Sequence, residues 1–462
     1  MTPTLWSGRF DGAPDAAAFE FGRSFRFDRR LFEDDVTGSR AWAKALARAG
    51  VIADSEAVQV DAALAAFEER AKADPDFVTG GDEDVHSFVE RLLVEAIGDA
   101  GRRLHTGRSR NEQVSLDLRL YLKRRIPSVE RAVAGVVEAL ARQALSAGDA
   151  LMPAFTHFRP AQPILVAHFL LSHAAPLRRD FERLEAARRE ADALPLGSGA
   201  VAGTAYDIDV EALARDLGFS RVVDNSVDAS SDRDFAASFL FSCSLTMVHL
   251  SRLAEDLIIL SGDEHRFFEL SDALSTGSSM MPQKKNPDPL ELVRGKSGRA
   301  IGHLVGLLTT IKGLPTGYNK DLQEDKEAVF GAEDTVMGCL DVVRSVVNGV
   351  TLNRERAAAA AAGLLLATDV ADYLVGRGIP FRRAHEIVGA LVRTLVAERR
   401  DFTSLSLHEW RAASDRFEAD IIERVTPAAS VNAKRTPQST APADVGRRLA
   451  EVRNWLQGVG VC

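Results

Sequence analysis

The sequence predicts an all-α protein built as three helical domains, of which the central one is a bundle of long helices. Residues that favour helices, namely alanine, leucine, glutamate and arginine, dominate the 462-residue chain. Apolar residues recur at spacings of three and four, whereas the alternating pattern of a strand is scarce. The length is also large for a single core, and a prior of about 150 residues per domain gives about three domains.

Five helical patterns follow one another through the middle of the chain. The first opens with a capping box, in which Ser109 and Glu112 stand three residues apart before an apolar run. Glycine or proline stands where the later patterns end. Each pattern covers on the order of 25 to 30 residues, or about 40 Å of helix. The patterns run from Ser109, from Pro163 towards Leu194, from Ser231 to near Gly262, from Pro289 to Gly313, and from Asp321 to about Asn348.

The domain boundaries follow from these patterns. Residues 1–110 and 361–462 are predicted to form smaller helical domains, and residues 111–360 the central long-helix bundle. Helices this long expose more apolar surface than one bundle can cover, so we expect copies of the chain to associate through the bundle faces. The alternative is a monomer whose outer domains cover those faces.

Composition narrows the class of protein. A net charge of −9 and a pI near 5.7 argue against a protein that binds nucleic acid. The three cysteines are widely spaced, which fits a reducing compartment and gives no metal-binding pattern; Cys243 lies in an apolar context and is expected in the core. The N-terminus lacks the basic and apolar segments of a leader, and no apolar run approaches about 18 residues. We therefore expect a cytoplasmic protein that does not enter membranes.

Residues 277–288, which read GSSMMPQKKNPD, form the most informative segment of the chain. Glycine, small hydroxyl residues and lysines suit a loop that moves and holds anions. The following residues fit a helix start, with Asp288 as the N-cap, Pro289 in the first turn and Glu291 as the reciprocal capping residue. The lysines and the positive end of that helix would then face a carboxylate together. The simpler interpretation is a solvated linker.

Three other segments combine polar residues in ways that a structural role explains poorly. Residues 105–111, HTGRSRN, place arginines and an asparagine at a helix start, where guanidinium groups and free N–H groups bind carboxylates. Residues 156–163, THFRPAQP, place His157 before two prolines and a long helix; imidazole is the usual proton carrier near neutral pH, although a lone histidine is more often structural. Residues 318–326, YNKDLQEDK, open a helix with a polar run, for which a charged helix face is the simpler interpretation.

Together these segments resemble the fumarase/aspartase superfamily of lyases, whose signature loop has the pattern Gly-Ser-Ser-x-Met-Pro-x-Lys-x-Asn-Pro. The version in this chain, with Gln-Lys-Lys-Asn-Pro-Asp, is similar to that of the argininosuccinate lyase family. The resemblance extends from Leu5 to about His385 and fades beyond it. It implies reversible cleavage of argininosuccinate to arginine and fumarate without a cofactor or metal. It also implies a homotetramer with a multi-helix core, in which the active sites are shared between subunits.

The resemblance assigns roles by position in these motifs. Ser278 is the expected general base and His157 the general acid, which Glu291 orients. Lys284 is expected to supply positive potential that favours ionisation of Ser278. The other matching positions are expected to contact the substrate, and they are Ser24, Arg110, Asn111, Thr156, Asn286, Tyr318, Gln323 and Lys326.

The chain departs from the family pattern at several positions. Gly22 stands where the family has asparagine, Glu112 where it has aspartate, and Arg159 where it often has glutamine. Val210 stands where the family often has an arginine after Ile208-Asp209. Residues 84–86, DVH, resemble a family segment near the site, although a surface loop explains them equally well.

Two alternatives remain open. Another superfamily member, such as adenylosuccinate lyase, would need to hold a phosphate and a purine; we find no phosphate loop, although Arg108 could serve. A helical structural protein is the other alternative, because the family includes lens crystallins derived from the enzyme. The presence of Ser278, His157, Glu291 and Lys284 favours activity.

Overall fold

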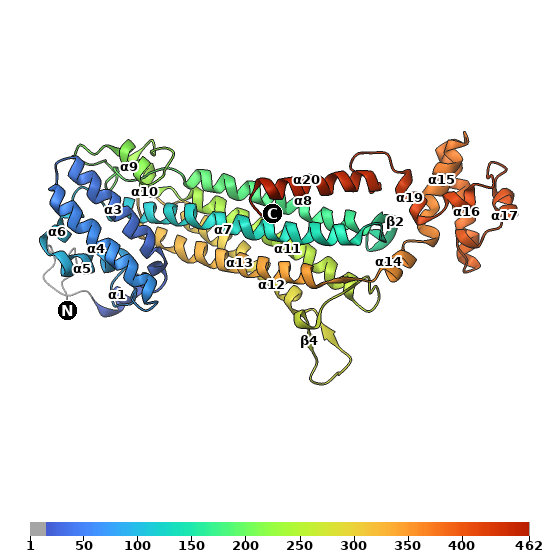
Figure 1. Ribbon diagram of the computed structural model, residues 1–462, viewed down its shortest axis with the longest axis horizontal. Helices are drawn as coiled ribbons and strands as arrows, with labels where there is room; N and C mark the ends of the chain where they lie inside the picture. Colours follow the sequence, from blue (N-terminus) through green and yellow to red (C-terminus); the bar gives the residue numbers. More distant parts are fainter. Residues whose placement is uncertain (1–14, 462) are drawn as a thin grey trace. The chain divides into compact units, whose positions relative to one another are not determined.

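The computed structural model describes residues 15–461 and confirms the all-α prediction. Helices account for most of this range, and its strands are short and occur in two-stranded pairs (Figure 1). The N-terminal segment in which no leader was found, residues 1–14, and Cys462 lie outside the described residues. Cys243 is fully buried, as predicted.

Five long helices correspond to the five predicted patterns. The first begins where the capping box predicts, since Ser109 N–H donates to the Glu112 carboxylate (3.0 Å) and Asn111 N–H donates to Ser109 Oγ (3.3 Å). In the described range no single helix is long and apolar enough to cross a membrane. One bent pair of helices, Arg354–Ala360 with Gly363–Gly376, has the length and composition of a membrane span. The long helices are α7 (Arg110–Ala147), α8 (Val166–Ala191), α11 (Asp234–Ser261), α12 (Asp288–Ile311) and α13 (Asp325–Gly349).

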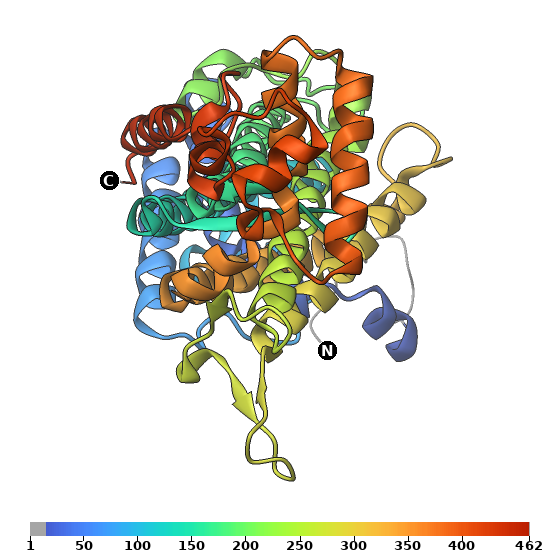
Figure 2. The same ribbon diagram turned by 90° about the vertical axis from the view of Figure 1, so that its right-hand side faces the viewer.

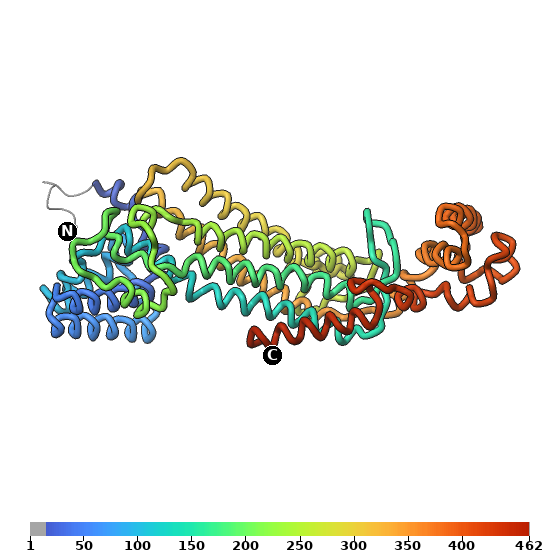
Figure 3. The backbone as a smooth tube through the Cα atoms, turned by 90° about the horizontal axis from the view of Figure 1, so that it is seen from above, coloured from blue at the N-terminus to red at the C-terminus, as the bar shows by residue number. Residues whose placement is uncertain are grey.

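The predicted start of the second pattern at Pro163 was wrong. Helix α8 begins at Val166, and the preceding residues form a hairpin of β1 (Leu151–Thr156) and β2 (Arg159–Leu165). A proline has no N–H to donate and disfavours helical geometry in the residue before it, so the prolines of β2 keep this stretch extended. Figure 3 shows the hairpin, in teal, standing away from the neighbouring helices.

The chain folds into two compact units, and each long helix contributes residues to both. The predicted division into residues 1–110, 111–360 and 361–462 stays a prediction. The first unit comprises Met1–Glu130, Glu182–Ser244 and Arg299–Val336, and the second comprises Arg131–Phe181, Leu245–Gly298 and Met337–Cys462.

The first unit is centred on helix α3, which packs against α4 and α5. Trp42 of α3 is fully buried, and its indole N–H donates to Thr106 O (3.2 Å). Phe32 and Phe88 meet edge to face at 6.2 Å and join α3 to α5. The shorter elements of this unit are α1 (Ala16–Gly22), α2 (Phe25–Asp28), η2 (Arg29–Leu31), α3 (Phe32–Arg48), α4 (Asp54–Ala73), α5 (Val85–Ile97), α6 (Asp99–Arg103), α9 (Val210–Asp216), α10 (Ser226–Ser231) and η4 (Lys320–Glu324).

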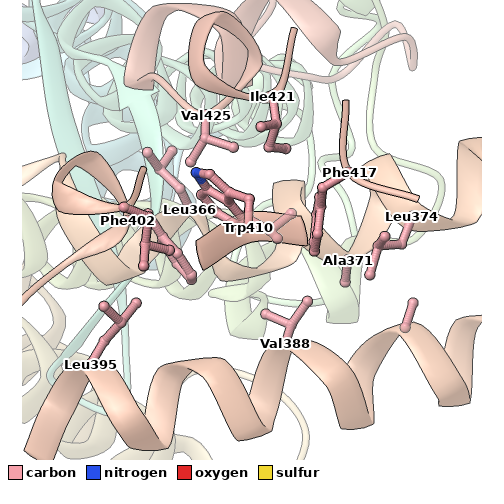
Figure 4. Packing of buried hydrophobic residues seen from close by; sticks show 13 residues of the cluster. Leu366, Ala371, Leu374, Val388, Leu395, Phe402, Trp410, Phe417, Ile421 and Val425 are labelled. Carbon is pink, nitrogen blue, oxygen red and sulfur yellow. The ribbon is translucent and has the colours of Figure 1, made fainter. Parts of the chain in front are cut away.

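The second unit contains a separate hydrophobic core near the C-terminus. Trp410 lies at its centre, stacked on Phe402 at 5.7 Å and tilted against Phe417 at 4.9 Å (Figure 4). The short strands of this unit form two further pairs, β3 (Phe268–Glu269) with β6 (Thr351–Leu352) and β4 (Thr276–Gly277) with β5 (Lys285–Asn286). Its remaining elements are η3 (Asp272–Leu274), α14 (Arg354–Ala360), η5 (Gly363–Leu366), α15 (Ala367–Gly376), α16 (Phe381–Ala397), η6 (Phe402–Ser404), α17 (Leu407–Ala413), α18 (Ile421–Arg424), α19 (Pro427–Ala433) and α20 (Pro442–Gly458).

Candidate active site

The residues singled out in the sequence fall into two groups, one in each compact unit. The first unit holds Ser24, Arg110, Asn111, Tyr318, Gln323 and Lys326. The second unit holds Thr156, His157, Ser278, Lys284, Asn286 and Glu291.

Ser24 is buried at the start of α2, where two elements of the first unit meet. Its hydroxyl donates to Asp28 Oδ2 (2.5 Å), and the other oxygen of Asp28 accepts from Val85 N–H (3.0 Å) at the start of α5. The backbone N–H groups of Ser24 and Phe25 both donate to Glu83 O. Asp28 therefore fixes Ser24 to the N-terminus of α5.

Arg110 lies in the first turn of α7 and points at the same end of α5. Its guanidinium donates to Asp84 Oδ1 at 2.7 Å and lies 3.7 Å from Glu90 Oε2. Asn111, the next residue, is half-buried and directs its amide towards Ala200 O at 3.5 Å. Arg110 is thus held by carboxylates of α5 while about a quarter of its side chain, 26%, stays exposed.

Tyr318, Gln323 and Lys326 complete the first group. Gln323 donates to Gly22 O (3.2 Å), two residues before Ser24, and Lys326 pairs with Asp325 Oδ1 (2.7 Å). Burial raises the pKa of Tyr318 to about 12, and the negative charge of Asp325 adds to the increase.

Buried charges that the sequence analysis passed over hold this group together. Asp325 is fully buried between Lys326 and Arg233, whose Nε lies 2.5 Å from Asp325 Oδ2. Burial opposes its ionisation, but these two cations keep the pKa of Asp325 below its ordinary value. Asp28 could have been found from its place four residues after Ser24, which is one helical turn. Asp325 stands inside residues 318–326, where the sequence alone favours a charged, solvated helix face for it, and its complete burial corrects that interpretation.

We call this group the first-unit cluster: Ser24, Asp28, Asp84, Arg110, Tyr318, Gln323, Asp325 and Lys326. It combines a partly exposed guanidinium, that of Arg110, with a buried ammonium and buried carboxylates, which suits a polar molecule that carries both charges. A cavity of about 270 Å³ lies next to it in sequence and space, lined among others by Arg233, Thr316 and Gly317. The cavity adjoins the cluster through Arg233, which pairs with Asp325, and through Gly317, which precedes Tyr318.

Glu112 has a structural task beside Arg110. Its carboxylate is fully buried and accepts from the backbone N–H groups of Ser109 (3.0 Å), Gly197 (2.9 Å) and Gly199 (2.9 Å). Burial raises the pKa of Glu112 to about 7, although these hydrogen bonds oppose the increase. Glu112 thus ties the start of α7 to the loop that also contacts Asn111.

Thr156 and His157 lie at the tip of the β1–β2 hairpin. Thr156 pairs with Arg159, so His157 and Phe158 form a two-residue turn, and both have positive φ angles, 54° and 56°. This geometry matches a type I′ hairpin turn. All of these side chains are exposed, and Phe158 is 83% exposed. The hairpin therefore presents His157 away from the unit that carries it.

Ser278 lies just beyond β4, in a second hairpin that projects from its unit (Figure 2). Its Oγ accepts from the backbone N–H groups of Met280 (3.3 Å) and Met281 (3.0 Å). Lys284 is exposed at the tip, and Asn286 of β5 donates weakly to Thr276 Oγ1 (3.5 Å). The signature segment is therefore an exposed arm rather than an unstructured linker.

Helix α12 follows this arm and begins one residue earlier than the capping pattern predicts. Glu291 N–H donates to Pro287 O (3.2 Å), while the Asp288 carboxylate accepts from Thr276 Oγ1 (2.5 Å) instead of capping the helix. The Glu291 side chain is 49% exposed, and its partner is Arg294 at 3.9 Å. Within residues 15–461 no ion pair or hydrogen bond joins Glu291 to His157, so their pairing stays a prediction.

One group in the described part of the chain has the arrangement of a metal site. Asp35, His86 and Asp117 are buried in the first unit, and their potential ligand atoms all lie within 4.8 Å of one another. The sequence analysis gave no metal pattern, because these residues come from three helices far apart in the chain. Their geometry also fits a charged imidazole between two carboxylates.

Comparison with known proteins defines the class to which this fold and site belong. Residues 8–302 match a family model described as Lyase, and residues 364–432 match one described as Argininosuccinate lyase C-terminal. The argininosuccinate lyase of Moorella thermoacetica is 48% identical over 459 residues, covering 98% of each chain. That of Geobacter sp. (strain M21) is 48% identical over 450 residues, covering 97% of this chain and 98% of its own. The chain belongs to the argininosuccinate lyase family.

Solved structures agree on the fold. An EDDS lyase variant with bound fumarate matches with a TM-score of 0.82 at 27% identity, covering 97% of this chain and 93% of its own. A class II fumarase from Schistosoma mansoni matches with a TM-score of 0.75 at 16% identity, covering 90% of this chain and 94% of its own, and supports the fold alone. The resemblance to fumarase/aspartase lyases inferred from the motifs is confirmed.

Proposed function

We propose that this protein cleaves argininosuccinate reversibly to arginine and fumarate. The observation that carries the proposal is the first-unit cluster, in which residues from distant motifs converge on the start of α5. Relatives at 48% identity over nearly the whole chain carry the name argininosuccinate lyase. In this β-elimination a base removes a proton from the carbon next to the C–N bond, that bond breaks, and the leaving guanidine takes a proton.

Ser278 is the proposed base. A serine hydroxyl is a very weak acid, so its ionisation needs nearby positive potential and a drier site. Hydrogen bonds from the N–H groups of Met280 and Met281 to Oγ favour the alkoxide, since donors stabilise a negative oxygen. Lys284 and closure of the exposed arm over bound substrate would add to this effect.

His157 is the proposed acid for the leaving guanidine, and Glu291 its orienting partner. The carboxylates of the fumarate end need cations and amide donors, whereas the arginine end needs a polar pocket. We assign Arg110, Asn111, Lys284 and Asn286 to the fumarate end, and Ser24, Thr156, Tyr318, Gln323 and Lys326 to the remaining contacts.

The exposure of the two catalytic hairpins supports a homotetramer with shared sites. His157 is exposed at one hairpin tip, and its proposed partner Glu291 is half exposed on α12. Helix α12 also exposes Ile301 (41%), Val305 (55%) and Leu308 (45%) on one side, which is unusual for a face that stays in water. A second copy packed there would cover these residues and could complete the site.

The proposed reaction places the protein in arginine biosynthesis in the cytoplasm. Cys243 is a free, buried thiol, which fits a reducing compartment. A membrane or nucleic-acid partner has no support in the charge balance of the chain.

The first test is fumarate production, followed by ultraviolet absorbance, with argininosuccinate, adenylosuccinate, malate and aspartate supplied separately. Turnover of argininosuccinate alone is the expected result. Turnover of another substrate would keep the chemistry but overturn the specificity. No turnover by folded protein would favour a structural role such as that of the lens crystallins.

Shared sites are tested by mixing two inactive variants. Ser278→Ala and His157→Asn each remove one catalytic group. If the two groups of each site come from different subunits, random hybrids should regain roughly a quarter of wild-type activity. Hybrids verified by mass spectrometry that stay inactive would show that one subunit supplies both groups.

A further inference from the structure

The first unit contains a buried cluster of charges that the proposed mechanism does not use. His86 Nδ1 hydrogen-bonds Asp35 Oδ1 at 2.9 Å and forms an ion pair with Asp117 Oδ2 at 3.2 Å. The three side chains are at most 1% exposed. Asp35 belongs to α3, His86 to α5 and Asp117 to α7, so the cluster joins three helices.

Charge balance explains why a histidine stands there. Two carboxylates buried side by side repel each other unless a cation lies between them. Burial opposes a charge on His86, but Asp117 and Asp35 outweigh it and raise the pKa of His86 to about 10. The same surroundings lower the pKa of Asp35, whereas burial and the negative charge of Asp35 raise that of Asp117, so Asp35 is the main charged partner of His86. At neutral pH His86 is therefore an imidazolium.

A resident metal ion explains the cluster less well. A metal would need the lone pair of His86 Nδ1, yet this one atom faces both carboxylates at hydrogen-bond distances. Arg108 is also buried, interacts with Asp35 and Asp117, and adds positive charge. The charged groups that act on His86 are Asp28, Asp35, Asp84 and Asp117, with His105 nearby, while Arg108 acts on Asp35 and Asp117.

His86 lies in the first turn of α5, and this turn carries the contacts of the first-unit cluster. Asp84, its N-cap, accepts from Ser87 N–H (2.7 Å) and holds Arg110 (2.7 Å). Val85 N–H donates to Asp28, which holds Ser24. A displacement of this turn would therefore move both substrate contacts together.

We propose that His86, clamped between Asp35 and Asp117, is a positioning residue that sets the place of Asp84 and Arg110 for substrate binding. The proposal rests on the proposed function, because Arg110 is assigned there to a substrate carboxylate. His86 itself touches no substrate; it acts through α5.

The experiment compares His86→Asn with Leu64→Ala in the purified full-length protein. Leu64 is fully buried on α4 in the same unit, so its truncation destabilises the unit while His86, Asp35 and Asp117 all remain in place as residues. We expect His86→Asn to raise KM for argininosuccinate about tenfold with kcat changed less than about twofold, and Leu64→Ala to leave KM unchanged. An equal rise in KM for both variants would show that His86 contributes only to the stability of the unit, which would overturn the proposal.

A double-variant cycle tests whether His86 acts through Asp84. If His86 acts through Asp84, the variant with both His86→Asn and Asp84→Asn should have a KM close to that of Asp84→Asn alone. A KM raised by the product of the two single effects would contradict an action through Asp84. If His86→Asn does not fold, His86→Asn with Asp35→Asn removes both charges and takes its place. The purified wild-type protein could also contain a stoichiometric metal ion whose removal by a chelator destabilises the protein. That result would contradict the assignment of His86 as an imidazolium.

Hydrogen–deuterium exchange separates this proposal from the proposed function. His86→Asn should speed exchange in peptides covering residues 22–28 and 83–90, whatever substrate the protein uses. Unchanged exchange there would refute the positioning role even if argininosuccinate is cleaved. Faster exchange in a protein that does not cleave argininosuccinate would support the positioning role and show that the proposed substrate is wrong.

Discussion

Replacing Asp84 by asparagine should weaken substrate binding, because Asp84 is the carboxylate that holds Arg110. The two groups meet at 2.7 Å, with 15% of the aspartate and 26% of the arginine side chain exposed. Asparagine keeps the shape and the oxygen that accepts from Ser87 N–H, so the cap of α5 should persist. The substitution therefore removes mainly the charge.

The size of the effect follows from the pKa of Asp84. Burial opposes its ionisation, but Arg110, His86 and the Ser87 N–H outweigh burial and lower the pKa from 3.8 to about 2. At about 1.4 kcal/mol per pKa unit, the ionised carboxylate contributes on the order of 2 kcal/mol to folding. Because the pKa is lower in the folded state, this contribution is present above pH ~4 and is lost as the pH falls towards 2.

Calorimetric unfolding of both proteins at pH 7 and near pH 3, together with steady-state kinetics, checks this reasoning. Asp84→Asn should be less stable than wild type at pH 7, the difference should shrink at low pH, and KM should rise. Asp82→Asn is the matched control, because Asp82 pairs with Arg91 at 2.9 Å in the same segment and does not contact Arg110. Equal KM values for the two variants, or a stability difference as large near pH 3 as at pH 7, would refute the argument.

Three further predictions concern other parts of the chain. Glu112→Gln should weaken the pH dependence of the thermal midpoint between pH 5 and 8. Because the pKa of Glu112 is raised to about 7 in the folded state, the wild type binds this proton more tightly when folded and loses stability as the pH rises through that value. Trp410→Ala should lower the free energy of unfolding by about 3 to 5 kcal/mol in urea titrations without changing KM, since Trp410 is 1% exposed in the C-terminal core. Gly302→Leu should abolish assembly in analytical ultracentrifugation while far-ultraviolet circular dichroism stays helical, because an added Cβ meets no atom of its own chain within 4 Å; a tetramer of unchanged stability would show that this face is solvated.

The sequence predicted the long helices because their signals are local. The capping box placed the start of α7, and the third pattern lies close to α11. The error at Pro163 arose because the helical pattern was started at this proline, whose backbone chemistry keeps the end of β2 extended. Pairing between β1 and β2 depends on a turn of only two residues, which no pattern of apolar spacing reveals.

The candidate site was predictable as a set of segments and not as an arrangement. Each motif contains candidate residues that lie within a few positions of one another in the sequence. The hydrogen bond from Gln323 to Gly22 and the pair between Arg110 and Asp84 join residues that are far apart in sequence, and only the fold brings them together. Buried partners such as Asp325 escaped notice because a charged residue in a polar run is usually solvated, and its burial depends on Arg233 from another helix.

The exposed hairpins connect the chemistry to assembly. Ser278, the proposed base, needs a site from which water is excluded, yet the arm that carries it includes exposed residues such as Met280 (86%) and Lys284. His157 likewise sits at an exposed tip. An isolated subunit would therefore leave both proposed catalytic groups in contact with water. Packing of further copies against the exposed apolar face of α12 would both bury that face and dry the hairpins, so activity should follow the fraction of assembled protein across a dilution series. Full activity in a monomeric Gly302→Leu variant would break this connection.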